Sequence, residues 1–469
     1  MRRLLPEPQP SRDTQLATQH AKAHPVRRGV KRVLLAMLMI CLVASLLGGL
    51  TLYTRHCQRQ LGVGAVEEPT PPATVVWGDD LARTGRFTAD VAFTDFAAPT
   101  GEATVPVTWD DAWFFADASA YNPELASAAA VIAALAYAES GYYQAATDCL
   151  PYIEIGLGAL GFTDISTASY RYRSEVTDEV LSLVTDESDA AAYGIAEKLV
   201  TSADGEERQL IAVTVRGSYG SEWLSNLQVL GGEDHPGYVA AADEICGELA
   251  PRIARAHAEG RAVELLLVGH SRGGAIANLV ASRADDSFGD GVTMSQVGDG
   301  DAGASATAQL GLTSADGVRA YTFASPATTT APEAAAARYG NIFNIVNPAD
   351  IMTYLPLQSW GYARYGVDVA LPSVAEADFS ASHAKMESTF LQIMNAESPY
   401  RPEDEQLIGS LLTDIGTQVD SAEALLTPAG VATVVSTCAL RVNPMELLYA
   451  HYPSVYIAWL YAEASAEVA

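Results

Sequence analysis

A run of apolar residues that ends in a glycine-flanked serine constrains the fold of this chain more than any other feature. Residues 265–283 read LLLVGHSRGGAIANLVASR. The first four are typical of a buried strand, and the small residues after Gly273 are typical of a closely packed helix. Between them, Gly269-His270-Ser271-Arg272-Gly273 has the spacing of a sharp strand-to-helix turn that presents a serine nucleophile. The pattern predicts strand, turn and helix, with Ser271 as the candidate nucleophile.

Three further segments share this pattern of an apolar run that ends in turn-forming residues. The four together are LIAVTVRGS (210–218), AVELLLVGHS (262–271), VRAYTFASPA (318–327) and IFNIVNPAD (342–350). Helical patterns lie between them, at 238–260 and 274–285. Continuous apolar strands that alternate with helices are typical of a parallel sheet covered on both faces, where functional residues gather beyond the carboxyl ends of the strands. The sequence predicts an α/β fold with a mostly parallel central sheet.

A serine nucleophile needs a base, and the base needs an acid that orients it. Asp350 ends the fourth strand-like segment, so we expect it at the same sheet edge as Ser271. The two histidines that follow it are His383 and His451. His383 lies in a polar helical stretch typical of the surface, whereas His451 lies at a turn beside Pro453. The chain order Ser, Asp, His favours His451 as the base and leaves His383 as the alternative.

The anionic intermediate of acyl transfer needs two hydrogen-bond donors. The residue after the nucleophile supplies one of them, here the backbone N–H of Arg272. The other is expected from the end of an earlier strand. Ser218, which follows the 210–217 run, offers both an N–H and a hydroxyl there.

These residues resemble the class 3 (fungal-type) lipases and their bacterial relatives. The resemblance covers roughly residues 121–460, apart from a stretch near 370–440, and it rests on VRGSYGSEWLSNL, VGHSRGG, AYTFASPAT, NIVNPADIMTYLP with GYARYG, and HYPSVYIAWL. It implies an α/β-hydrolase fold with Ser271, Asp350 and His451 as the triad, and Ser218 and Arg272 as the oxyanion hole. It also implies that SEWLSNLQVL (221–230) corresponds to a lid helix. Two positions depart from the family pattern, because Arg272 replaces a leucine and Arg364 stands near a usual histidine.

The resemblance implies a serine hydrolase of carboxylic esters that acts on lipid or acylglycerol esters without a metal or an organic cofactor. An esterase, a phospholipase A1 or a thioesterase on the same fold is an alternative. A catalytically silent, membrane-tethered surface or binding module is another. The 57 acidic residues against 28 basic ones give a net charge of −29, which excludes a nucleic-acid partner.

The N-terminal part predicts a membrane anchor. Residues 33–53 carry no charge, and this length spans a bilayer core as a helix. The basic residues of segment 1–32 just before it keep that segment cytoplasmic. The catalytic part would then be extracytoplasmic on a single-pass cell-membrane protein. A cleaved signal that ends near Ala65 would instead give a secreted protein.

The remaining organisation follows from composition. The Pro-rich start of residues 54–110 is typical of a linker or stalk, and the rest of that range has no clear assignment. The catalytic domain is expected over residues 111–469. The chain has five cysteines, and on an oxidising side one or two disulfides are possible without a pattern that pairs them.

Overall fold

The computed structural model describes a defined part of the chain, which is residues 75–76, 83–95, 97–137, 152–172, 191–217, 233–288, 310–425 and 446–467, with single positions between 427 and 437. The expected anchor at 33–53, the cytoplasmic segment 1–32 and the expected lid at 221–230 lie outside these residues. Among the helices of the described residues, none combines the length and the apolar character that crossing a bilayer requires.

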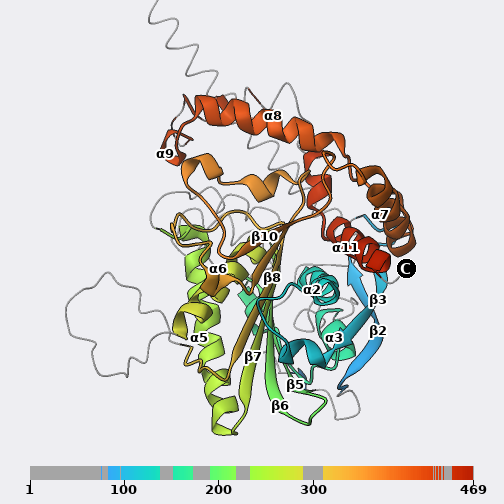
Figure 1. Ribbon diagram of the computed structural model, residues 1–469, viewed down its shortest axis with the longest axis vertical. Coiled ribbons are helices and arrows are strands. Elements are labelled where there is room, and N and C mark those ends of the chain that lie inside the picture. The colour runs from blue at the N-terminus through green and yellow to red at the C-terminus, as the bar shows by residue number, and fades with distance from the viewer. Residues whose placement is uncertain are drawn as a thin grey trace, which may run out of the picture. The chain divides into compact units, whose positions relative to one another are not determined.

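An eight-stranded sheet forms the centre of the fold (Figure 1). Its spatial order is β1-β4-β5-β6-β7-β8-β9-β10. The strands β6 to β10 pair in parallel, and β1, β4, β5 and β6 pair antiparallel. Their bounds are β1 Val75–Val76, β4 Asp164–Ser166, β5 Tyr193–Thr201, β6 Glu207–Val215, β7 Ala262–His270, β8 Gly317–Phe323, β9 Ile342–Val346 and β10 Val367–Ala370. The prediction of an α/β fold with a mostly parallel central sheet is confirmed.

The four apolar segments singled out in the sequence are the adjacent strands β6, β7, β8 and β9. Val215 pairs with Gly269, His270 pairs with Phe323, and Phe323 pairs with Ile345. The last residues of the four strands therefore lie at one edge of the sheet. The loops that leave this edge carry the candidate catalytic residues.

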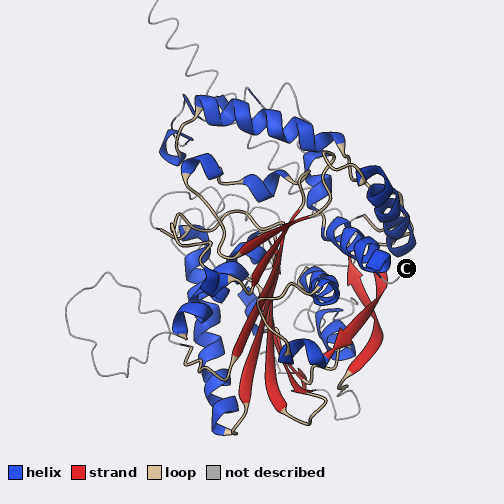
Figure 2. Ribbon diagram, in the orientation of Figure 1, coloured by secondary structure: helices blue, strands red, loops and turns tan. Residues whose placement is uncertain are grey.

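Helices cover both faces of the sheet (Figure 2). One face carries α5 (Pro236–Ala258) and α6 (Arg272–Ser287), and the other carries α2 (Pro123–Leu135), with α3 (Tyr152–Ala159) and α11 (Pro453–Glu467) packed beside α2. Successive residues of β7 alternate between the two hydrophobic cores, with Leu265 and Leu267 on the α5–α6 side. Leu266 and Val268 belong to the opposite core. Burial on both sides explains why β7 is continuously apolar.

A β-hairpin packs beside the sheet, in the part of residues 54–110 that had no clear assignment from the sequence. The strands β2 (Arg86–Thr94) and β3 (Glu102–Asp110) pair antiparallel in a second, two-stranded sheet. Their inward side chains, among them Phe93 and Trp109, are fully buried in the core that also contains α2 and α11. The strands β2 and β3 therefore lie in the packed body rather than in a linker. Pro106 in the middle of β3 breaks the usual strand composition, which weakens the sequence signal.

Three helices are described in the stretch near 370–440 that lacked any resemblance. They are α7 (Phe379–Met394), α8 (Glu403–Gln418) and α9 (Ala422–Leu425). In Figure 1, α8 lies beyond the edge where the parallel strands end. Ile408 and Leu411 of α8 cluster with Leu447 and Ile351, which lie close in sequence to the candidate base and acid. The insertion thus packs against both loops that hold the candidate pair.

The buried carboxyl group of Asp285 on α6 makes the stability of the fold depend on pH. Burial raises the pKa of Asp285 to about 8, and Asn341 Nδ2 donates to its Oδ1 at 3.0 Å. Its Oδ2 has no hydrogen-bond partner among the described residues. Between pH 4 and 8 the folded state therefore holds a proton that the unfolded state releases, so stability falls as pH rises through this window.

Replacement of Asp285 by asparagine is expected to remove that loss. The slope contributed by this group reaches at most ~1.4 kcal/mol per pH unit. The stability of the variant relative to wild type should therefore grow steadily from pH 4 to pH 8, as measured by urea unfolding at several pH values. An unchanged difference across the window would show that Asp285 is ionised in the folded protein.

The structure describes the bonding state of one of the five cysteines, Cys246. Cys246 of α5 is buried and forms no disulfide, and burial raises the pKa of its thiol to about 11. The other four cysteines lie outside the described residues, so the expected disulfides stay a prediction.

Candidate active site

Ser271 occupies a strained turn between β7 and α6. Its backbone has φ 57° and ψ −131°, a left-handed φ that a non-glycine residue rarely adopts. The Ser271 N–H donates to the carbonyl of Phe323 at 2.8 Å, which holds the turn against the end of β8. The Ser271 side chain makes no capping bond to α6. Its hydroxyl is therefore directed to other partners, as a nucleophile elbow requires.

The two flanking glycines are needed because the backbones cross closely at this turn. A Cβ atom on Gly269 would lie 2.2 Å from the carbonyl oxygen of Gly273. A Cβ atom on Gly273 would lie 2.1 Å from the carbonyl oxygen of Val215 in β6. Neither position can accept a side chain without movement of the backbone, which explains the small residues on both sides of Ser271.

The structure brings Ser271, Asp350 and His451 together, as their order in the sequence predicts. His451 Nε2 lies 2.9 Å from Ser271 Oγ, and His451 Nδ1 lies 2.8 Å from Asp350 Oδ2. His451 is the last residue of the 3-10 helix η8 (Glu446–His451), just before α11. All three residues are buried. The arrangement is that of a serine, a base and an orienting acid.

Asp350 uses its two oxygens for different purposes. Oδ1 accepts from the N–H of Met352 at 2.9 Å and caps the 3-10 helix η6 (Ile351–Tyr354). Oδ2 faces His451 and also accepts from the hydroxyl of Tyr456 in α11 at 2.8 Å. Burial and the nearby Asp350 charge raise the pKa of Tyr456 well above its usual value, so this hydroxyl stays protonated and donates. The capping role expected of an aspartate here therefore coexists with the contact to the base.

His383, the alternative base, lies in a different part of the structure. It is in α7, where its ring stacks on Phe379 with centroids 5.4 Å apart. Its Nε2 lies 3.6 Å from Glu387 Oε1 in the same helix. No described contact links it to Ser271 or Asp350, so geometry favours His451.

The oxyanion hole is described in part. Arg272 begins α6, and the first N–H groups of a helix have no acceptor within the helix. The N–H of Arg272 directly follows Ser271 at the start of α6, which is the position of the first expected oxyanion donor. Its side chain is fully buried and donates from Nη2 to the carbonyl of Gly237 in α5 at 3.2 Å. Ser218, the second expected donor, lies outside the described residues, although its neighbour Gly217 is described and buried.

Two residues with close contacts to the site were not assigned a role from the sequence. Tyr456 donates to Asp350, and Tyr137 lies within hydrogen-bond distance of His270, the residue before Ser271. Tyr456 follows His451 by five residues in a block typical of the resemblance, so it could have been suspected. Tyr137 gives no signal, because it is 133 residues from its partner.

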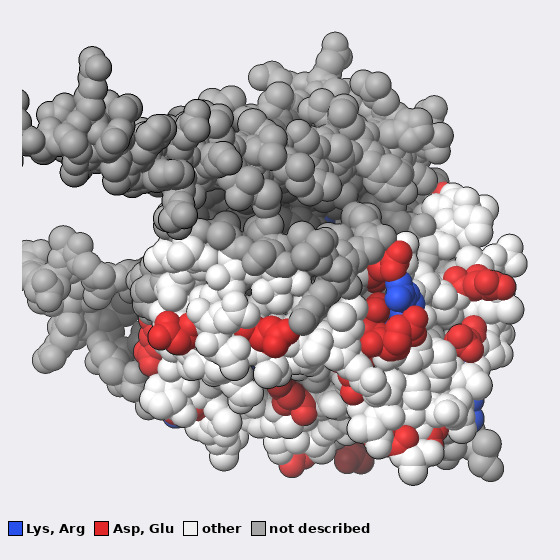
Figure 3. All heavy atoms as spheres, turned by 90° about the horizontal axis from the view of Figure 1, so that it is seen from above, with Lys and Arg blue, Asp and Glu red and all other residues white. Residues whose placement is uncertain are grey.

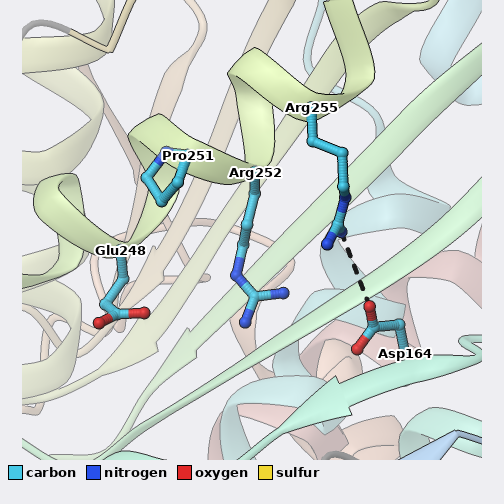
Figure 4. A pocket seen from close by; sticks show the side chains of 5 residues that line it. All are labelled: Asp164, Glu248, Pro251, Arg252 and Arg255. Carbon is cyan, nitrogen blue, oxygen red and sulfur yellow. Dashed lines mark ion pairs between the residues drawn. The ribbon is translucent and has the colours of Figure 1, made fainter. Parts of the chain in front are cut away.

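A surface pocket lies away from these residues. It is lined by Asp164 of β4 and by four residues of α5, namely Glu248, Pro251, Arg252 and Arg255 (Figure 4). Arg252 and Arg255 both donate to the buried carboxylate of Glu197 in β5. The pocket is therefore a structural ion-pair cluster. In the described part of the chain, no group of three or more His, Cys, Asp or Glu side chains could hold a metal ion.

Comparisons with solved structures give distant matches. The Rhizomucor miehei lipase in complex with its propeptide is 20% identical over 39% of this chain and 53% of that one, with a TM-score of 0.28. A mutant form of MDLA from Penicillium cyclopium is 21% identical over 53% of this chain and 77% of that one, with a TM-score of 0.29. This chain thus spans about half the length of the Rhizomucor miehei structure. A comparison with curated proteins finds no match.

A family model gives a match to part of the chain. Residues 206–296 match the model of lipase (class 3). This segment contains β6, α5, β7, the turn at Ser271 and α6. The resemblance predicted from the sequence is confirmed over this segment, in which residues 206–296, with the candidate nucleophile, match the class 3 lipase family.

Proposed function

We propose that this protein is a serine hydrolase of carboxylic esters. The observation that carries the proposal is the chain of contacts from Ser271 Oγ through His451 to Asp350, at 2.9 and 2.8 Å. His451 takes the proton from Ser271 as the hydroxyl attacks the ester carbonyl, and Asp350 holds the imidazole in the required orientation. His451 then gives the proton to the leaving alcohol, which leaves an acyl group on Ser271.

The second half of the reaction repeats the first with water. His451 takes a proton from water, the resulting hydroxide attacks the acyl carbonyl, and Ser271 recovers its proton. The N–H of Arg272 would hold the oxyanion in both halves, with Ser218 as the second donor. No step needs a metal or an organic cofactor.

The proposed substrates are neutral lipid esters such as acylglycerols. The class 3 lipase match of residues 206–296 supports this class. Acidic side chains outnumber basic ones on the described part of the face in Figure 3, in line with the net charge of −29. A surface of this charge repels anionic lipid headgroups. An esterase, phospholipase A1 or thioesterase activity at the same site is the alternative.

A catalytically silent surface or binding module is the competing class of function. A protein that kept only the scaffold has no need for a buried Ser271–His451–Asp350 contact chain or for a strained serine backbone. These features favour the enzyme. The proposed location is the cell membrane, through the 33–53 segment and with the catalytic part outside the cytoplasm. Cleavage of that segment would give a secreted enzyme.

The experiment is a series of p-nitrophenyl esters with acyl chains from acetate to palmitate, with the Ser271→Ala variant as the control. We expect turnover by wild type alone, with a preference for long chains. A preference for acetate would point to an esterase. Turnover that is equal in both proteins would mean that Ser271 is not the nucleophile.

A further inference from the structure

His270, the residue before the candidate nucleophile, contacts both the ring and the backbone of the candidate base, His451. Its ring is buried, at 1% exposure, between Tyr137, Tyr456 and His451. Its Nε2 lies 2.8 Å from the backbone carbonyl oxygen of His451. Its Nδ1 lies 2.8 Å from the hydroxyl oxygen of Tyr137. The ring therefore bridges the end of α2 and the residue that carries the base.

These two contacts define the tautomer that a neutral His270 ring adopts. A carbonyl oxygen can only accept, so Nε2 must carry the proton that joins His270 to His451. Nδ1 of the neutral ring then accepts the O–H of Tyr137. Burial and the neighbouring His451 lower the pKa of His270 well below its usual value, in agreement with a neutral ring.

A neutral ring at this place suits the proposed reaction. The centroids of the two imidazoles are 4.8 Å apart. When His451 takes the proton from Ser271 it becomes positively charged, and a second positive charge at this distance would oppose the transfer. His270 avoids this conflict and still donates a hydrogen bond to the backbone of the base.

The Tyr137 hydroxyl packs closely against the ends of the strands β6 and β7. A Cβ atom on Gly217, just past β6, would lie 1.9 Å from the Tyr137 hydroxyl oxygen and 2.7 Å from the carbonyl oxygen of His270. The hydroxyl thus occupies the space that the absent side chain of Gly217 leaves at the ends of β6 and β7. This placement gives His270 a fixed partner on its Nδ1 side.

The backbone around His451 has a second support of the same kind. Asn347, at the end of β9, donates from Nδ2 to the carbonyl of Ala450 at 3.1 Å. The carbonyls of two successive residues, 450 and 451, are thus each bound by a side chain from a strand end. Such contacts set where the imidazole of His451 lies relative to Ser271.

We propose that His270, oriented by Tyr137, is a positioning residue for the base: as a neutral donor to the His451 carbonyl it holds the His451 imidazole against Ser271. This inference rests on the proposed ester hydrolysis. It predicts an effect on kcat rather than on KM, because the contact affects the reacting groups and not the surface that binds the acyl chain.

The first test compares His270→Gln with His270→Leu in the full chain. Glutamine can donate from Nε2 and accept at Oε1, and it cannot be protonated. Leucine fills similar space without either bond. We expect leucine to lower kcat by about 10- to 100-fold at unchanged KM. Glutamine should recover most of that loss, with both variants folded by circular dichroism and thermal melting.

The second test removes one oxygen atom from Tyr137 and uses a matched control. Tyr137→Phe keeps the ring and deletes the partner of His270 Nδ1. Tyr170→Phe is the control, because the Tyr170 hydroxyl donates to the carbonyl of Ala136, one residue from Tyr137, at 2.6 Å. We expect a loss in kcat of about tenfold for Tyr137→Phe and less than twofold for Tyr170→Phe.

Several results would overturn the inference. A folded His270→Leu variant with the kcat of wild type would do so, as would glutamine and leucine variants that lose the same activity. Equal losses of kcat in Tyr137→Phe and Tyr170→Phe would show that the Tyr137 hydroxyl does not orient His270. Failure of the proposed function is distinguishable, since wild type itself would then show no turnover and no reaction with a fluorophosphonate.

Discussion

Replacement of His451 by alanine is expected to lower kcat for ester hydrolysis by about 10⁶-fold, the loss typical when the base of such a triad is removed. The reason is geometric. His451 Nε2 is the ring nitrogen within hydrogen-bond distance of Ser271 Oγ, at 2.9 Å, and without it the hydroxyl keeps its proton. The matched variant is His383→Ala, which should keep kcat within about twofold.

Steady-state kinetics on a p-nitrophenyl ester measures both variants, with protein concentration from absorbance and folding checked by circular dichroism. The reverse outcome, with activity kept in His451→Ala and lost in His383→Ala, would make His383 the base. Such a result would require α7 to leave the position that the structure gives it. Imidazole added to the His451→Ala reaction should restore part of the rate, since the vacated space beside Ser271 would accept it.

Replacement of Asp350 by asparagine is expected to lower kcat by about 10⁴-fold with little change in KM. Asp350 Oδ2 accepts from His451 Nδ1 and from Tyr456, both at 2.8 Å. An asparagine amide can present its NH₂ group to Nδ1. That contact would favour the tautomer with the proton on Nε2, which cannot accept the proton of Ser271.

Asp316→Asn is the matched control: it also replaces an aspartate that contacts a histidine, but outside the candidate active site. Asp316 is a buried carboxylate, 3.0 Å from the Nε2 of His257, and it also accepts from backbone N–H groups. Its replacement should lower thermal stability and leave kcat per folded molecule unchanged. Equal losses of kcat in the two variants would mean that Asp350 acts through stability and not through His451.

The strands of the parallel sheet could be predicted because each one is buried on both faces. The apolar runs 210–215, 262–268, 318–323 and 342–346 all became neighbouring strands. The hairpin β2–β3 could not be assigned with the same ease, since only one of its faces is buried and Pro106 interrupts β3. Its place in the body depends on contacts with α2, α3 and α7, which no local pattern reveals.

The order of Ser271, Asp350 and His451 in the chain indicated the site, but the sequence alone did not decide between two histidines. The reason is the insertion of α7, α8 and α9, which separates the acid from the base by 101 residues. In the structure, α8 packs against Ile351, just after the acid, and against Leu447, just before the base. The inserted helices therefore do not prevent Asp350 and His451 from meeting.

The contacts of His270 and Arg272 could not be predicted from the sequence, and the reason is different. His270 meets the backbone of His451, and a backbone carbonyl has no residue type that a pattern could detect. The Arg272 side chain is another case. It replaces a leucine of the family pattern next to the nucleophile, and its Nη2 donates to the carbonyl of Gly237 in the interior. Both contacts depend on tertiary structure, because each joins residues that are far apart in the sequence.

Covalent labelling of the full-length protein with a fluorophosphonate tests the central claim most directly. The probe reacts when a base-activated serine attacks phosphorus and displaces fluoride, so it needs Ser271 and His451 together. We expect one labelled peptide that contains Ser271 in wild type, and no labelling in a folded Ser271→Ala variant. Folded wild type that stays unlabelled, or that carries the label on another residue, would contradict the central claim.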